Sequence, residues 1–367
     1  MKVKCLTKTL KKSLSQAELF AGKDLDLPVL SCVVLETKNN FLEISATNIN
    51  TSFQANISVN VQEEGKVAVL ADLFSRTISN IESDEVDLVL EGNSLKVISK
   101  QNELEINTMD FSDFPSILTP EQLESEEKIE IEIPTKDFVE GVNSVIYATS
   151  KSSIKPELAS VFFNLQENIL DFTATDGFRL AEKEFVFKDK YSDFKILLPN
   201  DSASILVKAL SIEENSNTKL LYIDKNFFVE SENMTISLRL TEGDYIDYKK
   251  VIPDGGETSI IFLKKDFLNL SKIVNIFTDD FNQVKFIVKD GVVKIETKNK
   301  YGKNLSKLEA VIDGEDIEMS FNLKNILDAF NSIHTDSVEF LFNNGRPLLI
   351  KGVGDKSFKY IVMPLSK

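Results

Sequence analysis

The feature that most constrains this chain is a short helix-opening pattern that occurs three times at almost equal spacing. Residues 7–10 (TKTL), 135–138 (TKDF) and 264–267 (KKDF) each follow a strand-like segment and begin an amphipathic one, and their starts lie 128 and 129 residues apart. Similarity at a fixed period indicates a repeated structural unit. We therefore expect three copies of one unit, each long enough to fold as a domain.

Each expected unit runs twice through the same order of elements, which is a strand, a helix and then several strands. A chain of 367 residues is too long for a single hydrophobic core, and segments that contain Pro and Gly separate the units. The second helix of each unit should open near residues 70–72, 198–200 and 321–323. These patterns predict an α+β fold with three repeated domains, at residues 1–120, 128–250 and 257–367.

Composition narrows the class of protein. The hydrophobic fraction of 42% is ordinary for a globular chain, and no apolar run approaches the ~18 residues of a membrane-spanning helix. The first residues lack the apolar core of a secretory signal. Cys5 and Cys32 lie in strand-like apolar segments, so two buried free thiols are expected rather than a disulfide, as in a reducing compartment. We therefore expect a cytoplasmic protein without a membrane partner.

The distribution of charge leaves two interpretations open. The net charge of -16 argues against nucleic acid, unless the basic residues are confined to one surface. The expected helices carry eleven basic and seven acidic side chains, so the acidic excess lies elsewhere. Either these helices simply have solvated faces, or the repeats close into a ring with a weakly positive hole that holds a duplex through its phosphates. The helical windows are 7–20, 71–80, 135–151, 200–210, 264–276 and 322–333.

Residues 174–181 (ATDGFRLA) follow a predicted β-hairpin, with strands at 160–165 and 169–174 and a turn at 166–168. Asp176 could be imagined as a general base. An Asp-Gly pair at the end of a strand is far more typical of a bend, because Gly adopts positive φ without steric cost. We therefore interpret Asp176 and Gly177 as a turn.

No motif points to catalysis, to a cofactor or to a metal. The single histidine, His334, has no Cys or His neighbour in the sequence, so a metal site is not expected. The chain has no P-loop, dinucleotide-binding fingerprint, nucleophile elbow or zinc-protease motif. We expect a protein that is not an enzyme and holds neither a cofactor nor a metal.

Three features together resemble the bacterial DNA sliding clamp, the beta subunit of DNA polymerase III. They are the threefold repeat, residues 175–181 (TDGFRLA) and the ending 362–365 (VMPL). Over the whole chain, the resemblance implies three domains of the DNA-clamp fold, with helices lining the inside of a ring and sheets outside. It implies a processivity factor for DNA replication, in which two chains close head to tail, domain 1 against domain 3, as a homodimer around double-stranded DNA of any sequence.

The resemblance also implies an apolar pocket that captures a short linear motif. The expected partners are the DNA polymerase catalytic subunit, the clamp loader ATPase, and other replication and repair proteins that carry such a motif. The alternative for the chain's ending is an edge strand whose apolar residues pack on its own sheet. Phe178, Ile246 and Ser366 depart from residues common in the family. The pocket residues implied are Leu158, Thr175, Phe178, Arg179, Leu180, Ile246, Val251, Leu348, Ile361, Val362, Met363, Pro364 and Leu365.

Two further sets of residues follow from the ring. The expected dimer interface contains Leu104 and Ile106 from the last strand of the first unit and Ile276 and Phe277 from the end of a helix in the third. Unpaired edge strands are an aggregation hazard unless another chain covers them. The DNA-facing set is diffuse and comprises Lys8, Lys11, Lys12, Lys23, Arg76, Lys136, Lys151, Lys208, Lys264, Lys265, Lys272 and Lys324.

Two rival functions make different predictions from those of a sliding clamp. A three-domain protein-interaction scaffold without a DNA role would form no ring and would give no reason for basic helices. An enzyme would need clustered acids or a cofactor loop, which the sequence lacks.

Overall fold

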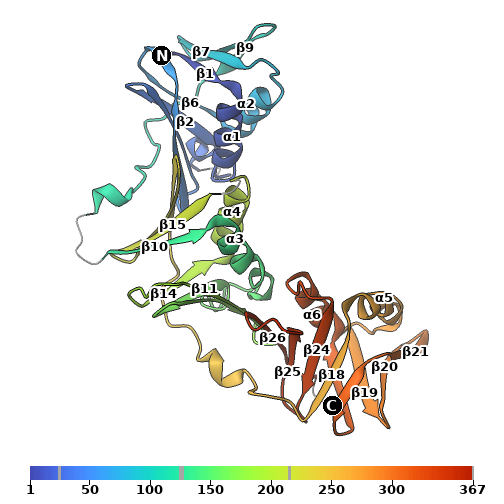
Figure 1. Ribbon diagram of the computed structural model, residues 1–367. Coiled ribbons are helices and arrows are strands. Elements are labelled where there is room, and N and C mark those ends of the chain that lie inside the picture. Colours follow the sequence, from blue (N-terminus) through green and yellow to red (C-terminus); the bar gives the residue numbers. More distant parts are fainter. Residues whose placement is uncertain (24–25, 124–127, 214–215, 366–367) are drawn as a thin grey trace. The chain divides into compact units, whose positions relative to one another are not determined.

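The computed structural model describes residues 1–23, 26–123, 128–213 and 216–365. The chain forms two compact units, one built from Met1–Val139 and Asp201–Leu240 and the other from Glu140–Asn200 and Thr241–Lys367. Every strand pairing within the two units is antiparallel. Figure 1 labels the elements along the chain.

The predicted helix openings are confirmed, because α1 begins at Thr7, α3 at Thr135 and α5 at Lys264. A β-strand with alternating burial runs directly into each of these helices. The helices are α1 (Thr7–Glu18), α2 (Ala71–Ser79), α3 (Thr135–Asn143), α4 (Asn200–Leu210), α5 (Lys264–Val274) and α6 (Leu323–Asp328).

The first unit contains a five-stranded sheet and an eight-stranded sheet. The larger sheet joins strands from the first and second repeats, because β17 pairs with β4. The five strands, in spatial order, are β5 (Asn60–Glu63), β1 (Lys2–Leu6), β7 (Glu85–Glu91), β8 (Ser94–Ile98) and β9 (Glu103–Asn107). The eight are β10 (Lys128–Pro134), β15 (Asn217–Ile223), β16 (Asn226–Ser231), β17 (Met234–Leu238), β4 (Thr51–Ser58), β3 (Phe41–Thr47), β2 (Cys32–Lys38) and β6 (Lys66–Leu70).

The second unit has a nine-stranded and a four-stranded sheet. The larger one joins the second and third repeats, because β13 pairs with β26. Its strands, in order, are β14 (Phe194–Pro199), β11 (Ser160–Gln166), β12 (Ile169–Thr175), β13 (Arg179–Val186), β26 (Phe358–Val362), β25 (Leu348–Gly352), β24 (Ser337–Phe342), β18 (Thr258–Leu263) and β22 (Val311–Gly314). The smaller sheet has β21 (Gly302–Leu308), β20 (Val292–Asn299), β19 (Gln283–Lys289) and β23 (Ile317–Asn322).

Two of the expected helices end at least five residues before their predicted bounds. The window 135–151 was expected to be one helix, but α3 ends at Asn143 and the 3-10 helix η3 (Ile146–Ala148) follows. The carbonyl oxygens of η3 accept hydrogen bonds from side chains, with Thr149 Oγ1 donating to Ile146 at 2.8 Å and Arg179 to Tyr147 at 2.7 Å. The window 322–333 likewise changes after Asp328 into a 3-10 helix, η6 (Ala329–Asn331).

Aromatic side chains fill much of the core in the second unit. Phe267 of α5 stacks on Phe330 with ring centroids 5.0 Å apart, and Phe340 of β24 meets both rings edge-on. Each fully buried Phe contributes about 1.5–3 kcal/mol through removal of apolar surface from water. This cluster holds the helices of the third repeat on the strand β24 that leads into β25 and β26.

The two cysteines lie where the sequence predicted, both buried and both free. Burial, followed by the charge of Asp87, raises the pKa of Cys5 to about 12. Among the described residues, no helix is both long enough and apolar enough to span a membrane.

Candidate functional site

The two signature stretches of the sequence lie side by side as strands β13 and β26. Arg179 is opposite Val362, and Leu180 is opposite Ile361. Beyond the paired residues, the Met363 amide donates a hydrogen bond of 2.8 Å to the Phe178 carbonyl. Residues from the middle and from the end of the chain therefore form one local surface.

The predicted hairpin and bend are confirmed at the start of β13. Gly177 has a φ of +89°, which favours a residue without a Cβ. The Asp176 Oδ1 atom accepts hydrogen bonds from the amides of Phe178 (2.9 Å) and Arg179 (3.1 Å). The Thr175 hydroxyl accepts from the Gly177 amide at 3.1 Å and donates to the Arg179 carbonyl at 2.6 Å. These contacts favour the turn over a general base, because the Asp176 carboxylate is occupied by the backbone.

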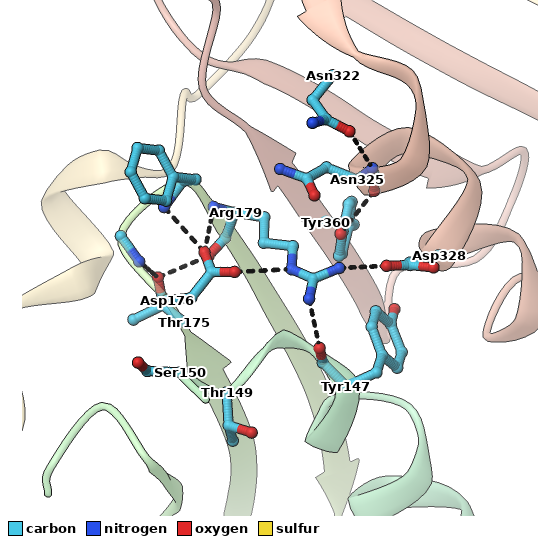
Figure 2. A network of polar contacts seen from close by, with 12 residues as sticks. Tyr147, Thr149, Ser150, Thr175, Asp176, Arg179, Asn322, Asn325, Asp328 and Tyr360 are labelled. Atoms are coloured by element: carbon cyan, nitrogen blue, oxygen red, sulfur yellow. Dashed lines mark hydrogen bonds and ion pairs between the residues drawn. The ribbon is translucent and has the colours of Figure 1, made fainter. Parts of the chain in front are cut away.

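Arg179 is the centre of a polar network in the second unit (Figure 2). Its Nε donates to Asp176 Oδ2 at 3.0 Å, its Nη1 pairs with Asp328 Oδ2, and its Nη2 donates to the Tyr147 carbonyl at 2.7 Å. The side chain is only 11% exposed, and the Tyr147 ring lies 5.9 Å from Cζ. We call Arg179, Asp176, Asp328 and Tyr147 the arginine network. The guanidinium thus ties β13 to α6 and η3.

The same region fixes β26 to the helix α6. The Tyr360 hydroxyl donates to the Asn325 carbonyl at 2.7 Å, and the Asn322 side chain caps the helix by accepting from the Asn325 amide at 3.1 Å. Burial raises the pKa of Tyr360 and of Tyr147 above the ordinary value, so both hydroxyls stay neutral in the physiological range. Nothing in the sequence near residue 179 indicated these partners.

Burial and charge act in opposite directions on Arg179. Burial alone lowers the pKa of the guanidinium, whereas Tyr360 and the Asp176 carboxylate beside it raise it, and the net shift is upward. The cation is therefore held in its charged form and is committed to contacts within the chain.

The segment between β17 and β18 packs on the sheet beside the arginine network. Tyr245 stacks on Phe162 with ring centroids 4.6 Å apart, and Tyr248 meets the same ring edge-on at 6.3 Å. These aromatic contacts hold the segment on β11 of the second repeat. The buried cluster beneath comprises Phe162, Leu180, Leu197, Tyr248, Leu341, Leu349 and Ile361.

Ion pairs hold the same segment and strand β26. Lys249 pairs with Asp171 at 2.9 Å, and Lys359 pairs with Glu182 at 3.0 Å and with Glu184 at 2.7 Å. The three carboxylates lie close enough together to be considered for a metal ion. Because two ammonium groups already occupy them, the arrangement is that of an ion-pair cluster.

The predicted pocket residues divide into buried, half-buried and exposed members. Leu158, Pro364 and Leu365 are half-buried, and Ser366 lies outside the described residues. Phe178 is 69% exposed and lies next to Met363 through their backbone hydrogen bond. The buried residues are Thr175, Leu180, Leu348, Ile361 and Val362, and the exposed apolar ones are Phe178, Ile246, Val251 and Met363.

The predicted DNA-facing cations fall into two groups. Lys11 donates to the Ile81 carbonyl at 2.6 Å and Lys264 to the Ile333 carbonyl at 2.5 Å, so these two also bind their own domain. Among the exposed ones, Lys12 pairs with Glu213 at 2.8 Å and Arg76 with Asp72 at 2.6 Å. The exposed members are Lys8, Lys12, Lys23, Arg76, Lys136, Lys151, Lys208, Lys265, Lys272 and Lys324.

The predicted dimer residues lie on the edge strand β9 and in a 3-10 helix beside the hairpin of β20 and β21. Leu104 is 40% exposed on the edge strand β9, whereas Ile106 on the same strand is 5% exposed and is part of its own core. Ile276 is 68% exposed. Ile276 and Phe277 belong to the 3-10 helix η5 (Asn275–Phe277), which follows α5 and packs on the hairpin of β20 and β21.

Comparisons with known proteins identify the same protein family along the full chain. Models of the DNA polymerase III beta subunit match in order, with the N-terminal domain at residues 1–118, the central domain at 132–247 and the C-terminal domain at 249–366. The beta sliding clamp of Rickettsia bellii is 24% identical over 386 residues, covering 100% of this chain and 99% of the relative.

Solved structures have the same fold. The DNA polymerase III beta subunit of Thermotoga maritima matches with a TM-score of 0.93 and 26% identity, covering 100% of this chain and 99% of that one. The sliding clamp of Bacillus subtilis matches with a TM-score of 0.91 and 21% identity over 100% and 99% of the two chains. The three similar domains predicted from the repeat are therefore confirmed.

Proposed function

We propose a function from one premise: this chain belongs to the DNA polymerase III beta subunit family, the bacterial DNA sliding clamps. As a processivity factor, it keeps a polymerase on its template by topology, which raises the effective concentration of polymerase at the primer end. In this proposal two copies close head to tail, domain 1 against domain 3, around duplex DNA. The ring acts in the cytoplasm and has no catalytic site of its own.

The charge of the helices supports a loose hold on DNA. Ten of the twelve predicted cations are exposed, while two of those ten are also paired with acids of their own unit. Contacts to phosphate carry no sequence information and weaken with salt. A small positive excess on the helices suits a ring that must slide, whereas a dense basic surface would hold the DNA in place.

The surface beside β13 and β26 supports capture of a short apolar peptide. Phe178, Ile246, Val251 and Met363 are exposed apolar side chains. Each Leu or Phe that a guest buries there is worth about 1.5–3 kcal/mol, and Met363 allows the wall to adapt to different guests. The proposed guests are segments of the polymerase catalytic subunit, the clamp loader ATPase, and other replication and repair proteins.

A single observation carries the proposal. The two signature stretches, far apart in the sequence, pair as β13 and β26, and the arginine network holds them there. A scaffold without a DNA role could have such a surface, but it would not need the basic helices or the unpaired edges of β9 and β21.

The test measures retention on DNA after loading. The full chain is loaded onto a nicked circular plasmid by the clamp loader of the same organism with ATP, and is then washed at a salt concentration that removes electrostatic binders. One half of the sample is linearised before the wash. We expect retention on the circle and loss from the linear form, because a ring slides off free ends.

The other outcomes contradict this proposal in different ways. Equal loss from circle and linear DNA would mean that no closed ring forms, and the interaction scaffold would become the better hypothesis. Equal retention on both would mean tight direct contact with DNA. As a control, blocking both ends of the linear plasmid with bound protein should restore retention.

A further inference from the structure

The four-stranded sheet of the second unit has a row of lysines on its solvent face. Lys294 lies directly opposite Lys307, and Lys298 directly opposite Lys303, across the antiparallel pair β20–β21. Directly opposed side chains in such a pair have Cβ atoms about 4.5–5.5 Å apart, and like charges there are destabilising. We call these four residues the lysine ladder.

The second unit does little to neutralise this ladder. Glu296 lies between the lysines of β20, where its direct neighbours are Leu305 on one side and Lys285 on the other. Within the ranges that the structure describes, no ion pair involves any of the four lysines. Strand β21 is also an edge of its sheet, so its outer backbone groups are free to pair with another strand.

The edge strand β9 of the first unit has the opposite charge. Glu103 and Glu105 share a face with Glu91 and Lys96. Lys96 lies opposite Glu105 and forms ion pairs with Glu91 at 2.6 Å and Glu103 at 3.8 Å, so one ammonium serves three carboxylates. The Ser94 hydroxyl adds a hydrogen bond of 2.5 Å to Glu105. This edge therefore has an excess of negative charge.

We propose that the acidic face of β9 in one copy is the partner of the lysine ladder in a second copy, and that this pairing decides which edges meet. The inference rests on the proposed ring and adds the residues that set its polarity. A strand of one copy that extends the sheet of another forms backbone hydrogen bonds that do not depend on side-chain charge. The charges supply the selectivity, because β9–β9 and β21–β21 pairs place like charges together.

Two double variants of the full chain test the proposal. Lys303→Glu with Lys307→Glu makes β21 acidic, and Glu103→Lys with Glu105→Lys makes β9 basic. We expect each variant alone to self-associate at least about tenfold more weakly than the natural chain, because its two edges then have the same charge. A mixture of the two should recover association, because both edges are complementary in the mixed dimer. Sedimentation velocity at low and high salt measures both.

A control separates this effect from a general loss of positive charge. Lys289→Glu with Lys356→Glu changes two exposed lysines outside the ladder and should leave association unchanged. Thermal unfolding reports whether each variant is folded. We expect the acidic-β21 variant to be at least as stable as the natural chain, since it removes the like-charge pairs.

The results that overturn this inference differ from those that overturn the ring. If the natural chain is retained on circular plasmid but the acidic-β21 variant associates normally, the ring remains and the ladder does not determine its polarity. If both variants dissociate and the mixture does not recover, the two charged faces do not meet. If the variant associates normally but loses duplex DNA, the ladder binds nucleic acid instead.

Discussion

Arg179 and the lysine ladder are cationic groups in the same unit, but their surroundings differ. Arg179 is 11% exposed and meets two carboxylates and a carbonyl from three separate segments. Lys303 and Lys307 are exposed and lie opposite other lysines. Arg179 is satisfied within the chain, whereas no ion pair among the described residues involves Lys303 or Lys307.

The arginine network is completed by the chain alone, whereas we infer that the lysine ladder needs another molecule. A buried charge without partners costs several kcal/mol, so Arg179 must be paired before any guest arrives. An exposed charge without a partner costs little, because water solvates it. The surface beside β13 is therefore formed within one copy. We expect the edge of β21 to be covered only when a second copy binds.

The largest effect is expected from Arg179→Ala, which removes the cation that is paired within the chain. The change leaves Asp176 and Asp328 without their cation and releases η3 and α6 from β13. Removing one partner from a largely buried charge pair costs about 3 kcal/mol. The midpoint of urea unfolding, followed by circular dichroism, should fall clearly.

The matched control for Arg179→Ala is Lys303→Ala, which removes an exposed cation of the same unit. Its unfolding midpoint should stay the same or rise, because a like-charge pair disappears. Similar losses for both variants would mean that the arginine network is no more important to folding than a surface charge.

A smaller effect, on binding alone, is expected from Phe178→Ala. Phe178 is 69% exposed, so its removal should leave the unfolding midpoint within the error of the measurement. Affinity for a fluorescent peptide from the clamp-binding segment of the polymerase should fall about tenfold, which corresponds to ~1.4 kcal/mol. Fluorescence anisotropy measures the dissociation constant.

Phe281→Ala is the control for this measurement, because Phe281 is an aromatic residue of the same unit with 74% exposure. It should leave peptide affinity unchanged. An unaltered affinity in Phe178→Ala would place the guest elsewhere, while the arginine network would keep its structural role.

The repeat, the helix openings and the bend were predictable because their signals are local. A strand that runs straight into Thr7, Thr135 or Lys264 changes the hydrophobic period from two to about 3.6, and this change is visible in one copy and reinforced by three. The Asp176-Gly177 bend was predictable because only a few residue types adopt its backbone angles.

The partners of Arg179 were not predictable from the same sequence. Asp328 lies 149 residues away, and no pattern around either residue indicates the pairing of β13 with β26. Apolar alternation marks a strand but does not say which strand lies next to it. The contact of Arg179 with the Tyr147 carbonyl, just beyond the end of α3, was equally hidden from the sequence.

The smallest effect is expected from Leu104→Ala, which tests whether the exposed edge of β9 contributes to self-association. Leu104 is 40% exposed at the edge strand β9, so truncation should change folding little and should weaken self-association by about 1 kcal/mol. Ile106→Ala, two residues along the strand, removes a side chain that is 5% exposed and should cost about 2–4 kcal/mol of folding stability. Sedimentation velocity measures self-association of both variants, and thermal unfolding measures their stability.

If Leu104→Ala lowers stability as much as Ile106→Ala, the edge of β9 is complete within one copy. If it weakens only association, the edge needs the second copy, as the charges on the same strand indicate.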